Sequence, residues 1–311
     1  MNKVHVPPIK CQGIKTKLVD WIDSVIHWNN EGTWIEPFVG SGVVGFNMLP
    51  KQALFGDSNP HIIRFYEAIQ RGEITPQNTR QFLEKEGTIL KKAGEAHYYY
   101  IRERFNQSHD PLDFLFLNRS CFNGVIRFNQ KGAFNVPFGH KPERFAPAYV
   151  TKIVNQVAFV ADCTKTFQWK FVCQDFRETI ALASSKDLIY CDPPYLGRHV
   201  DYFNTWDEAQ ELKLYKALKK SPNRFILSTW HSNAYRKNPY IETLWQEFFI
   251  LTREHFYHVG AQETNRNPML EALIMNYRPP ISEIYRPQNG FQYSLFEPHN
   301  SYTVQATDDL P

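Results

Sequence analysis

The chain has 311 residues, a net charge of only +3, and 42% hydrophobic residues. That apolar fraction is enough to bury a core, which excludes wholesale disorder. The length suits one large α/β domain with an inserted module, or two ordinary domains. So small a positive charge does not by itself identify a nucleic-acid-binding protein, because the local distribution of charge decides that question.

The cysteines are odd in number and lack the spacing of a metal finger: Cys11, Cys121, Cys163, Cys173 and Cys191. We therefore expect reduced thiols, no metal ion and a bacterial-type cytoplasm. The N-terminus has no apolar signal core. No apolar stretch approaches the roughly 20 residues needed to span a bilayer, so we expect a soluble protein without membrane contact.

The first half of the chain predicts strands that alternate with helices. Residues 33–39 indicate a short buried strand, which Gly40-Ser41-Gly42 and an apolar helix at 43–48 follow. A second strand at 53–56 ends at Asp57. Ser58 or Asn59 can cap the next helix, which begins at Pro60. Residues 76–120 look helical, most clearly at 97–105 and 110–118.

The stretch 123–139 has a different pattern, with an Asn-Gly step, alternating side chains and a glycine turn, and it predicts a β-hairpin. A helix is expected near 145–161. The remaining elements are strands at 169–173, 187–191 and 224–230, a helix at 208–220, and final strands at 248–256 and 271–277, with irregular chain after Pro279. This alternation predicts a mostly parallel sheet covered on both faces, with the middle segment as an insertion.

The first candidate site follows the first strand, at residues 36–42. A glycine turn at the end of a strand lets a ligand approach the backbone closely. Asp57, at the end of the next strand, can bind two ribose hydroxyls. No Lys-Ser pair follows, so a nucleoside without phosphates is favoured. The alternatives are an ordinary turn and, for Asp57, a helix N-cap.

The strongest signal is Asp192-Pro193-Pro194-Tyr195, again at a strand end. The exocyclic amine of a base is a poor nucleophile, because its lone pair is delocalised into the ring. Two acceptors for its hydrogens, the Asp192 carboxylate and the Pro193 carbonyl, would favour attack on a methyl sulfonium. The two prolines stiffen the loop, and Tyr195 offers an aromatic face for stacking and for developing positive charge. The alternative is a stiff loop with a capping aspartate.

With these motifs the sequence resembles the DNA adenine methyltransferase (Dam-like) family from Pro8 to about Tyr277. Asp192 to Tyr195 match its catalytic tetrapeptide without departure, and Asn204 and Trp206 beyond it could hold a flipped base. The resemblance implies contacts to S-adenosylmethionine from Lys10, Gly13, Lys15, Glu36, Pro37, Phe38, Gly40, Gly42, Asp57, Asp175, Phe176 and Asp192. Cys11 stands where the family usually has an aromatic residue. For Asp175, an N-cap before the following helix is an equal alternative.

The middle segment is similar to the family's DNA-reading hairpin. Residues 118–144 carry five lysines and arginines against one glutamate, and a β-ribbon fits the major groove. The resemblance implies DNA contacts from Arg119, Asn123, Arg127, Asn129, Lys131 and Asn135. Arg127 could be bidentate to a guanine, whereas Asn129, Lys131 and Asn135 could equally touch phosphates. The alternative is a solvated basic hairpin.

The resemblance implies a Rossmann-like methyltransferase sheet, covered by helices on both faces, with an inserted, mainly helical module that carries the hairpin. The expected domains are a discontinuous cofactor-binding catalytic domain (1–70 and 165–280), a target-recognition domain (71–164) and a tail (281–311). The implied activity is methyl transfer from S-adenosylmethionine to N6 of a flipped adenine in double-stranded DNA. We expect a GAT-containing site, a restriction-modification system, and a monomer or weak dimer.

Four other functions are weighed against this one. Cytosine-N4 methylation poses the same chemical problem, but a tetrapeptide that begins with Asp resembles the adenine enzymes more. Cytosine-C5 methylation needs a nucleophilic cysteine, and Cys191 lies before the aspartate on the strand. An inactive DNA-binding relative would be free to lose Asp192. A nucleotide-dependent oxidoreductase, which would bind its cofactor at a Gly-x-Gly-x-x-Gly turn, is the fourth alternative.

Overall fold

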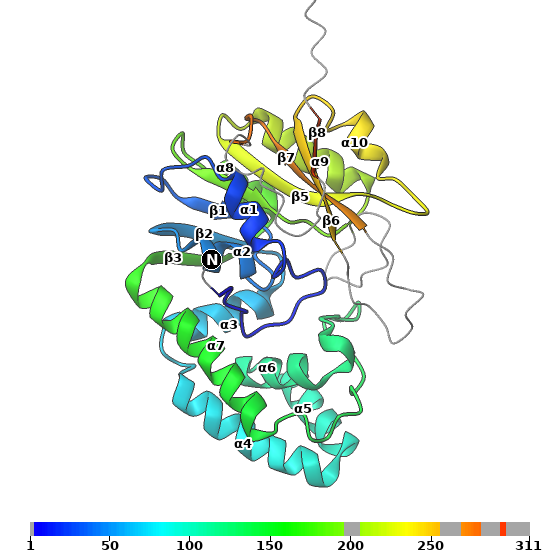
Figure 1. Cartoon of the computed structure of the whole chain (residues 1–311). Helices are drawn as coiled ribbons and strands as arrows, with labels where there is room; N and C mark the ends of the chain where they lie inside the picture. The colour runs from blue at the N-terminus through cyan, green and yellow to red at the C-terminus, as the bar shows by residue number, and fades with distance from the viewer. Residues whose placement is uncertain (1–2, 196–205, 256–268, 281–292, 297–311) are drawn as a thin grey trace, which may run out of the picture.

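The computed structural model describes residues 3–195, 206–255, 269–280 and 293–296. A single sheet runs through the centre of this part of the chain (Figure 1), in the order β3-β2-β1-β4-β5-β7-β6-β8. Its strands are β1 (Trp34–Glu36), β2 (Gln52–Asp57), β3 (Gln168–Cys173), β4 (Leu188–Cys191), β5 (Arg224–Asn233), β6 (Phe249–His255), β7 (Met269–Met275) and β8 (Tyr293–Phe296).

The first five strands of the sheet are parallel. β1 pairs with both β2 and β4, β2 pairs with β3, and β4 pairs with β5. β7 is antiparallel to β5 and β6, and β8 is antiparallel to β6. The carboxyl ends of β1, β2 and β4 therefore meet at one edge, where the strand order reverses between β1 and β4. In open α/β sheets, ligands bind outside the carboxyl ends at such a switch point.

Helices cover both faces of the sheet, because alternate strand residues point to opposite faces. Trp34 and Tyr190 enter one hydrophobic core, whereas their neighbours Ile35 and Ile189 enter the other. The first core includes residues of α1 (Val19–Val25), α2 (Val43–Met48) and α3 (Pro60–Gln70), and the second includes residues of α8 (Phe176–Ala181), α9 (Glu208–Lys220) and α10 (Pro239–Thr243). This arrangement confirms the predicted Rossmann-like α/β sheet.

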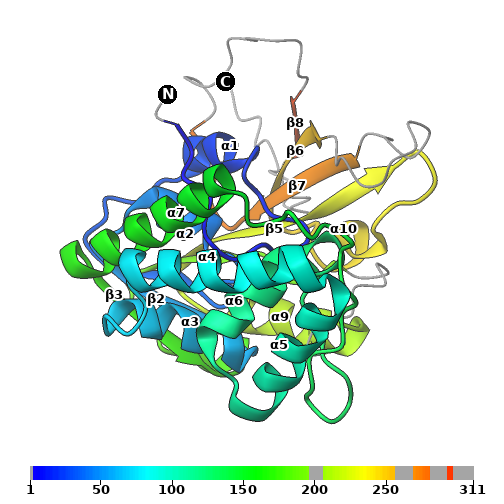
Figure 2. The same ribbon diagram turned by 90° about the horizontal axis from the view of Figure 1, so that it is seen from below.

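The segment between α3 and β3 forms a group of helices beside the sheet. It contains α4 (Pro76–Ala93), α5 (Glu95–Ser108), α6 (Pro111–Ser120), the short 3-10 helix η1 (Phe122–Gly124) and α7 (Pro147–Thr166). Figure 2 shows α4, α5 and α6 together on the near side of the molecule. Leu83, Phe105 and Val157 belong to the same hydrophobic core as Trp34 of β1, so the helical group and the sheet share one continuous core.

The predicted hairpin is less regular than a β-ribbon. Residues 121–139 contain two isolated antiparallel bridges, Cys121↔Phe138 and Phe128↔Phe134, and no strand. The Gly132 N–H donates to the Asn129 carbonyl at 2.8 Å and closes the turn. Asn123 has a φ of 54° inside η1, in the left-handed region that interrupts an extended ladder. The two arms thus run antiparallel without forming a continuous ladder.

The sequence patterns missed several short elements, among them α1, α10 and β8. The short helix α1 buries Val19, Trp21 and Ile22. A helix of 7 residues is too short to give a clear hydrophobic periodicity in the sequence. β8 lies in the tail that was predicted to be irregular, of which the structure describes residues 293–296. It adds to the sheet through β6 alone, with Leu251 opposite Leu295. None of the helices that the structure describes is long and apolar enough to cross a membrane.

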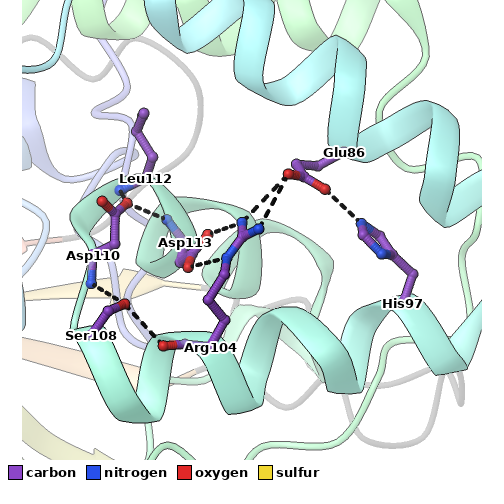
Figure 3. Close-up of polar contacts among 7 residues, drawn as sticks. All are labelled: Glu86, His97, Arg104, Ser108, Asp110, Leu112 and Asp113. Atoms are coloured by element: carbon purple, nitrogen blue, oxygen red, sulfur yellow. Dashed lines mark hydrogen bonds and ion pairs between the residues drawn. The ribbon is translucent and has the colours of Figure 1, made fainter.

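A charge network joins three helices of the inserted group (Figure 3). Arg104 on α5 donates to both carboxylate oxygens of Asp113 on α6, at 2.8 and 2.5 Å, and lies 3.4 Å from Glu86 on α4. Glu86 also contacts His97 at 2.8 Å. Burial raises the pKa of the Asp113 carboxyl, and Arg104 opposes that shift. Buried carboxylates need such partners, so the network holds the three helices together.

Replacing Arg104 with leucine should destabilise the protein by about 3 kcal/mol, because Asp113 and Glu86 lose their shared cation. The loss should shrink as the pH is lowered. Without Arg104 the folded-state pKa of Asp113 rises further above its unfolded value, so protonation relieves the penalty. Urea denaturation at neutral and at mildly acidic pH measures both effects.

The control for this prediction is Arg80→Leu. Arg80 pairs with Glu84 at 3.3 Å on the same helix group, but both side chains are exposed, so the change should cost under about 1 kcal/mol. Equal losses of unfolding free energy in Arg104→Leu and Arg80→Leu would contradict the stabilising role assigned to the buried network.

Candidate active site

Three carboxyl groups lie at the carboxyl edge of neighbouring parallel strands. Glu36 ends β1, Asp57 ends β2, and Asp192 directly follows β4. Burial raises the pKa of Glu36 to about 8; the Trp34 N–H, donated at 2.7 Å, opposes the shift and the charge of Asp192 adds to it. Burial also raises the pKa of Asp57 to about 6, against the N–H groups of Asn59 and Gly40. The edge is therefore strongly acidic, and Glu36 is mostly protonated at neutral pH.

The ammonium group of Lys15 is buried at this acidic edge. The Lys15 ammonium lies 2.9 Å from Asp192 Oδ1, 3.0 Å from the Gly13 carbonyl, and 4.7 Å from the centroid of the Tyr195 ring. Lys15 is only 2% exposed. Burial raises the pKa of Asp192, and the charge and hydrogen bond of Lys15 oppose that shift. Lys15 thus favours the ionised form of Asp192, the aspartate of the Asp-Pro-Pro-Tyr loop.

The glycine turn after β1 is tied to Asp57. The N–H groups of Gly40 and Asn59 donate to the two oxygens of Asp57, at 2.9 and 2.8 Å. Gly42 has a φ of +74°, and a Cβ there would lie 2.4 Å from the Phe46 ring, so only glycine suits this position. The N-cap of α3 is Asn59, which accepts the His61 N–H at 3.0 Å. Asp57 is therefore not the helix cap that was weighed as its alternative.

Aromatic side chains gather beyond the ends of β1 and β3. Phe38 stacks on Phe176 with ring centroids 5.2 Å apart, and Trp206 lies 5.4 Å from the first ring and 5.6 Å from the second. Pro37, next to Phe38, is buried. Phe38 and Phe176 were both predicted cofactor contacts, and the structure brings them together. Asn204 lies outside the described residues.

Asp175 has the geometry of a helix cap. It accepts the Arg177 N–H at 2.8 Å at the start of α8, and the Arg177 guanidinium binds both of its oxygens, at 2.7 and 3.1 Å. The hydrogen bonds from Arg177 lower the pKa of Asp175. The structure therefore favours the capping interpretation over a cofactor contact.

Lys10 and Arg119 contact the inserted helices. The Lys10 backbone exchanges hydrogen bonds with the Asn118 side chain at 2.8 and 2.9 Å, and its ammonium lies 5.8 Å from the Tyr149 ring. Arg119 is 3% exposed, and it donates to the Pro8 carbonyl at 2.7 Å. Its guanidinium also bonds to the Pro7 carbonyl, Gln156 and Tyr149. The DNA contact expected of Arg119 is therefore corrected, because its guanidinium is buried. Its donors join the N-terminal segment to α6 and α7.

The other predicted DNA-binding residues divide into two groups. Arg127 donates to the Asn135 side chain at 2.8 Å across the two arms, and Asn129 accepts the N–H groups of Lys131 and Ala133 within the turn. These contacts shape the hairpin. Asn123 and Lys131 are exposed, as is Asn129 at the turn. The exposed side of the hairpin also presents Phe122, which is 53% exposed.

Two residues at the site were not predicted from the sequence. Cys11 lies beside the glycine turn, because a Cβ built on Gly40 would be 3.7 Å from its sulfur. Burial and then the nearby Asp57 and Asp192 raise the pKa of its thiol. Glu271 on β7 accepts the Tyr195 hydroxyl at 2.5 Å. The only sequence signal for Glu271 is a single acid within the apolar stretch 269–275.

The strand order defines a Rossmann-like α/β protein, with the candidate site at the ends of β1, β2 and β4. The family described as D12 class N6 adenine-specific DNA methyltransferase matches residues 12–259. The match covers well over half of the sequence and includes the glycine turn, the hairpin and the Asp-Pro-Pro-Tyr loop. The chain therefore belongs to this family.

Individual relatives agree with the family. The DNA adenine methylase of Vibrio cholerae serotype O1 is 36% identical over 191 residues, which are 60% of this chain and 64% of that protein, so the match spans less than two thirds of its length. The DNA adenine methylase of Haemophilus influenzae is 31% identical over 252 residues, 76% of this chain and 83% of that one. The type II methyltransferase M.FokI of Planomicrobium okeanokoites is 27% identical over 288 residues, 89% of this chain and 43% of that protein.

Replacing Arg119 with alanine should lower the free energy of unfolding by about 3 kcal/mol, because several buried carbonyl and amide groups lose their charged donor. Lys131→Ala should leave stability unchanged, since its side chain is exposed. If Lys131 contacts a DNA phosphate, its loss should weaken DNA binding and reduce the salt dependence by about one charge. Thermal unfolding and salt-dependent DNA binding measure these effects, and an undestabilised Arg119→Ala would contradict the structural assignment.

Proposed function

We propose that the protein transfers a methyl group from S-adenosylmethionine to the N6 amine of adenine in double-stranded DNA. The observation that carries the proposal is the pairing of Asp192 with the buried Lys15, beside the Tyr195 ring, at the switch point of the sheet. Family membership supports the choice of adenine and of DNA.

The Asp-Pro-Pro-Tyr loop supplies what an exocyclic amine needs in order to react. An ionised Asp192 accepts one N–H of the amine, and the Pro193 carbonyl accepts the other. These two hydrogen bonds localise the lone pair on the nitrogen, and the Tyr195 ring favours the positive charge that develops there. Asp192 also offers a site for the proton that the amine must lose. No covalent intermediate with the protein is required, so positioning and electrostatics account for catalysis.

The residues at the strand ends fit S-adenosylmethionine, which supplies an activated methyl group on a sulfonium. A cationic ligand suits an edge that has three carboxyl groups and one buried lysine. Asp57 would bind ribose hydroxyls, and Phe38 and Phe176, which lie together beyond the strand ends, would contact the adenine of the cofactor. Lys10 and Asp175 have other partners, so we leave both out of this set.

We propose that the α4–α7 group, expected as the 71–164 domain, recognises the target while the sheet performs the chemistry. Asn123, Lys131 and the exposed Phe122 form the outer side of the hairpin, which can reach into a groove. A stacked adenine cannot enter the acidic edge, so the base must flip out of the duplex at a cost of a few kcal/mol.

The proposal also covers the target sequence, the biological system and the oligomeric state. A GAT-containing target follows from the resemblance of the hairpin to those of the family. A restriction-modification system is supported by the match to M.FokI, which spans most of this chain. We propose that the protein acts as a monomer or weak dimer.

Binding of S-adenosylmethionine should weaken as the pH falls through about 6, where Asp57 becomes protonated, because a carboxylate is the stronger acceptor for ribose hydroxyls. Asp57→Asn should weaken binding about tenfold at neutral pH and remove that pH dependence. Isothermal titration calorimetry across this range measures both, with Asp175→Asn as the control. A pH-independent affinity in the unaltered protein would argue against Asp57 as the ribose acceptor.

The central test is to incubate the protein with S-adenosylmethionine and unmethylated plasmid, then to identify the methylated nucleoside by mass spectrometry. We expect N6-methyladenine, reduced about 1000-fold or more in Asp192→Ala and unchanged in Asp162→Ala, which alters an exposed acid on α7. Sequencing of the modified sites tests the GAT assignment. N4-methylcytosine would overturn the substrate, and no methylation despite cofactor binding would overturn the activity.

A further inference from the structure

Tyr195 is bonded to a carboxylate that comes from a strand outside the Asp-Pro-Pro-Tyr loop. Its hydroxyl donates to Glu271 Oε2 at 2.5 Å. Glu271 lies on β7, which is separated from β4 by β5, and it stands opposite Trp230 of β5 in the antiparallel register. The bond therefore joins the antiparallel side of the sheet to the loop that follows β4.

Glu271 is a buried acid in an apolar strand, and the Tyr195 hydroxyl is among its partners. Glu271 is 0% exposed in a strand whose other side chains are apolar. Burying a carboxylate costs free energy that an apolar side chain would avoid. A hydroxyl that donates to a buried carboxylate forms a short and strong bond. The carboxylate at this position therefore gives the Tyr195 hydroxyl a strong acceptor.

The Tyr195 ring is constrained on several sides. Glu271 holds the hydroxyl, the Lys15 ammonium lies 4.7 Å from the ring centroid, and Trp230 and Met269 pack in the same small cluster. Tyr195 is only 8% exposed. A base that stacks on this ring meets a surface whose orientation is set before the base arrives.

We propose that Glu271 is a positioning residue of the transfer site, an inference that rests on the proposed function. It orients the Tyr195 ring against the target amine without touching the base. Donation of the Tyr195 hydroxyl to a carboxylate also enriches the ring in electrons, which strengthens its attraction for the positive charge that develops on the amine. Its contribution should therefore appear in the rate of transfer rather than in the binding of DNA or S-adenosylmethionine.

The test uses Glu271→Leu, Glu271→Gln, Tyr195→Phe and the double variant Tyr195→Phe/Glu271→Leu in the full chain. We expect Glu271→Leu to slow single-turnover methylation about 10- to 100-fold, with dissociation constants for DNA and S-adenosylmethionine unchanged. Glu271→Gln, which keeps an acceptor for the hydroxyl, should recover most of the rate. Glu254→Leu, which alters an exposed acid on neighbouring β6, is the matched control.

The double variant separates positioning from general stability. If Glu271 acts through the Tyr195 hydroxyl, Tyr195→Phe should be about as slow as Glu271→Leu, and the double variant no slower than Tyr195→Phe. Tyr195→Phe also answers the question if Glu271→Leu does not fold, because it leaves the glutamate in place and should still show the loss.

Three results would overturn the inference. They are a normal rate in Tyr195→Phe, losses that multiply in the double variant, or a folded Glu271→Leu whose only change is a lower Tm. Failure of the proposed function would look different, because the unaltered protein would then transfer no methyl group to DNA. The inference would fall with it.

Discussion

The ion pair between Lys15 and Asp192 is the contact on which the arrangement of the site depends. Asp192 stands at an edge that already holds Glu36 and Asp57, and burial of three acids together opposes their ionisation. Lys15 opposes that effect at Asp192, the acid proposed to accept a hydrogen bond from the target amine. Because this lysine belongs to the N-terminal segment, the site is complete only when that segment lies across the carboxyl ends of the strands.

The N-terminal segment is itself held by the inserted helices. Arg119 binds the carbonyls of Pro7 and Pro8, and the Asn118 side chain pairs with the backbone of Lys10. Asn118 and Arg119 end α6, just before the arms of the hairpin begin. The same two residues therefore anchor the segment that carries Lys15 and fix the start of the element proposed to contact DNA.

The sequence predicted most of the fold because strand-helix alternation is local. The turn at Gly40, the acid at Asp57 and the tetrapeptide at Asp192 are also local patterns, and the strand ends placed them at one edge. Interactions between distant segments could not be predicted. No periodicity indicates that Arg119 faces inward towards Pro8, that Arg127 pairs with Asn135, or that Glu271 reaches Tyr195, because each depends on how separate elements pack.

The basic hairpin shows why residue type alone overstates DNA contact. An arginine is as useful for tying buried carbonyls together as for reading a base, since its planar donors suit both tasks. Arg119 binds buried carbonyls, and Arg127 donates a hydrogen bond to Asn135 across the two arms of the hairpin. Internal bonds of this kind stiffen a segment that has no continuous ladder, so the exposed Asn123 and Lys131 can be presented in a fixed geometry. For the proposed methyl transfer, a stiff hairpin and a fixed Tyr195 ring meet the same requirement, because the target base has to arrive where its acceptor and its stacking face are already in place.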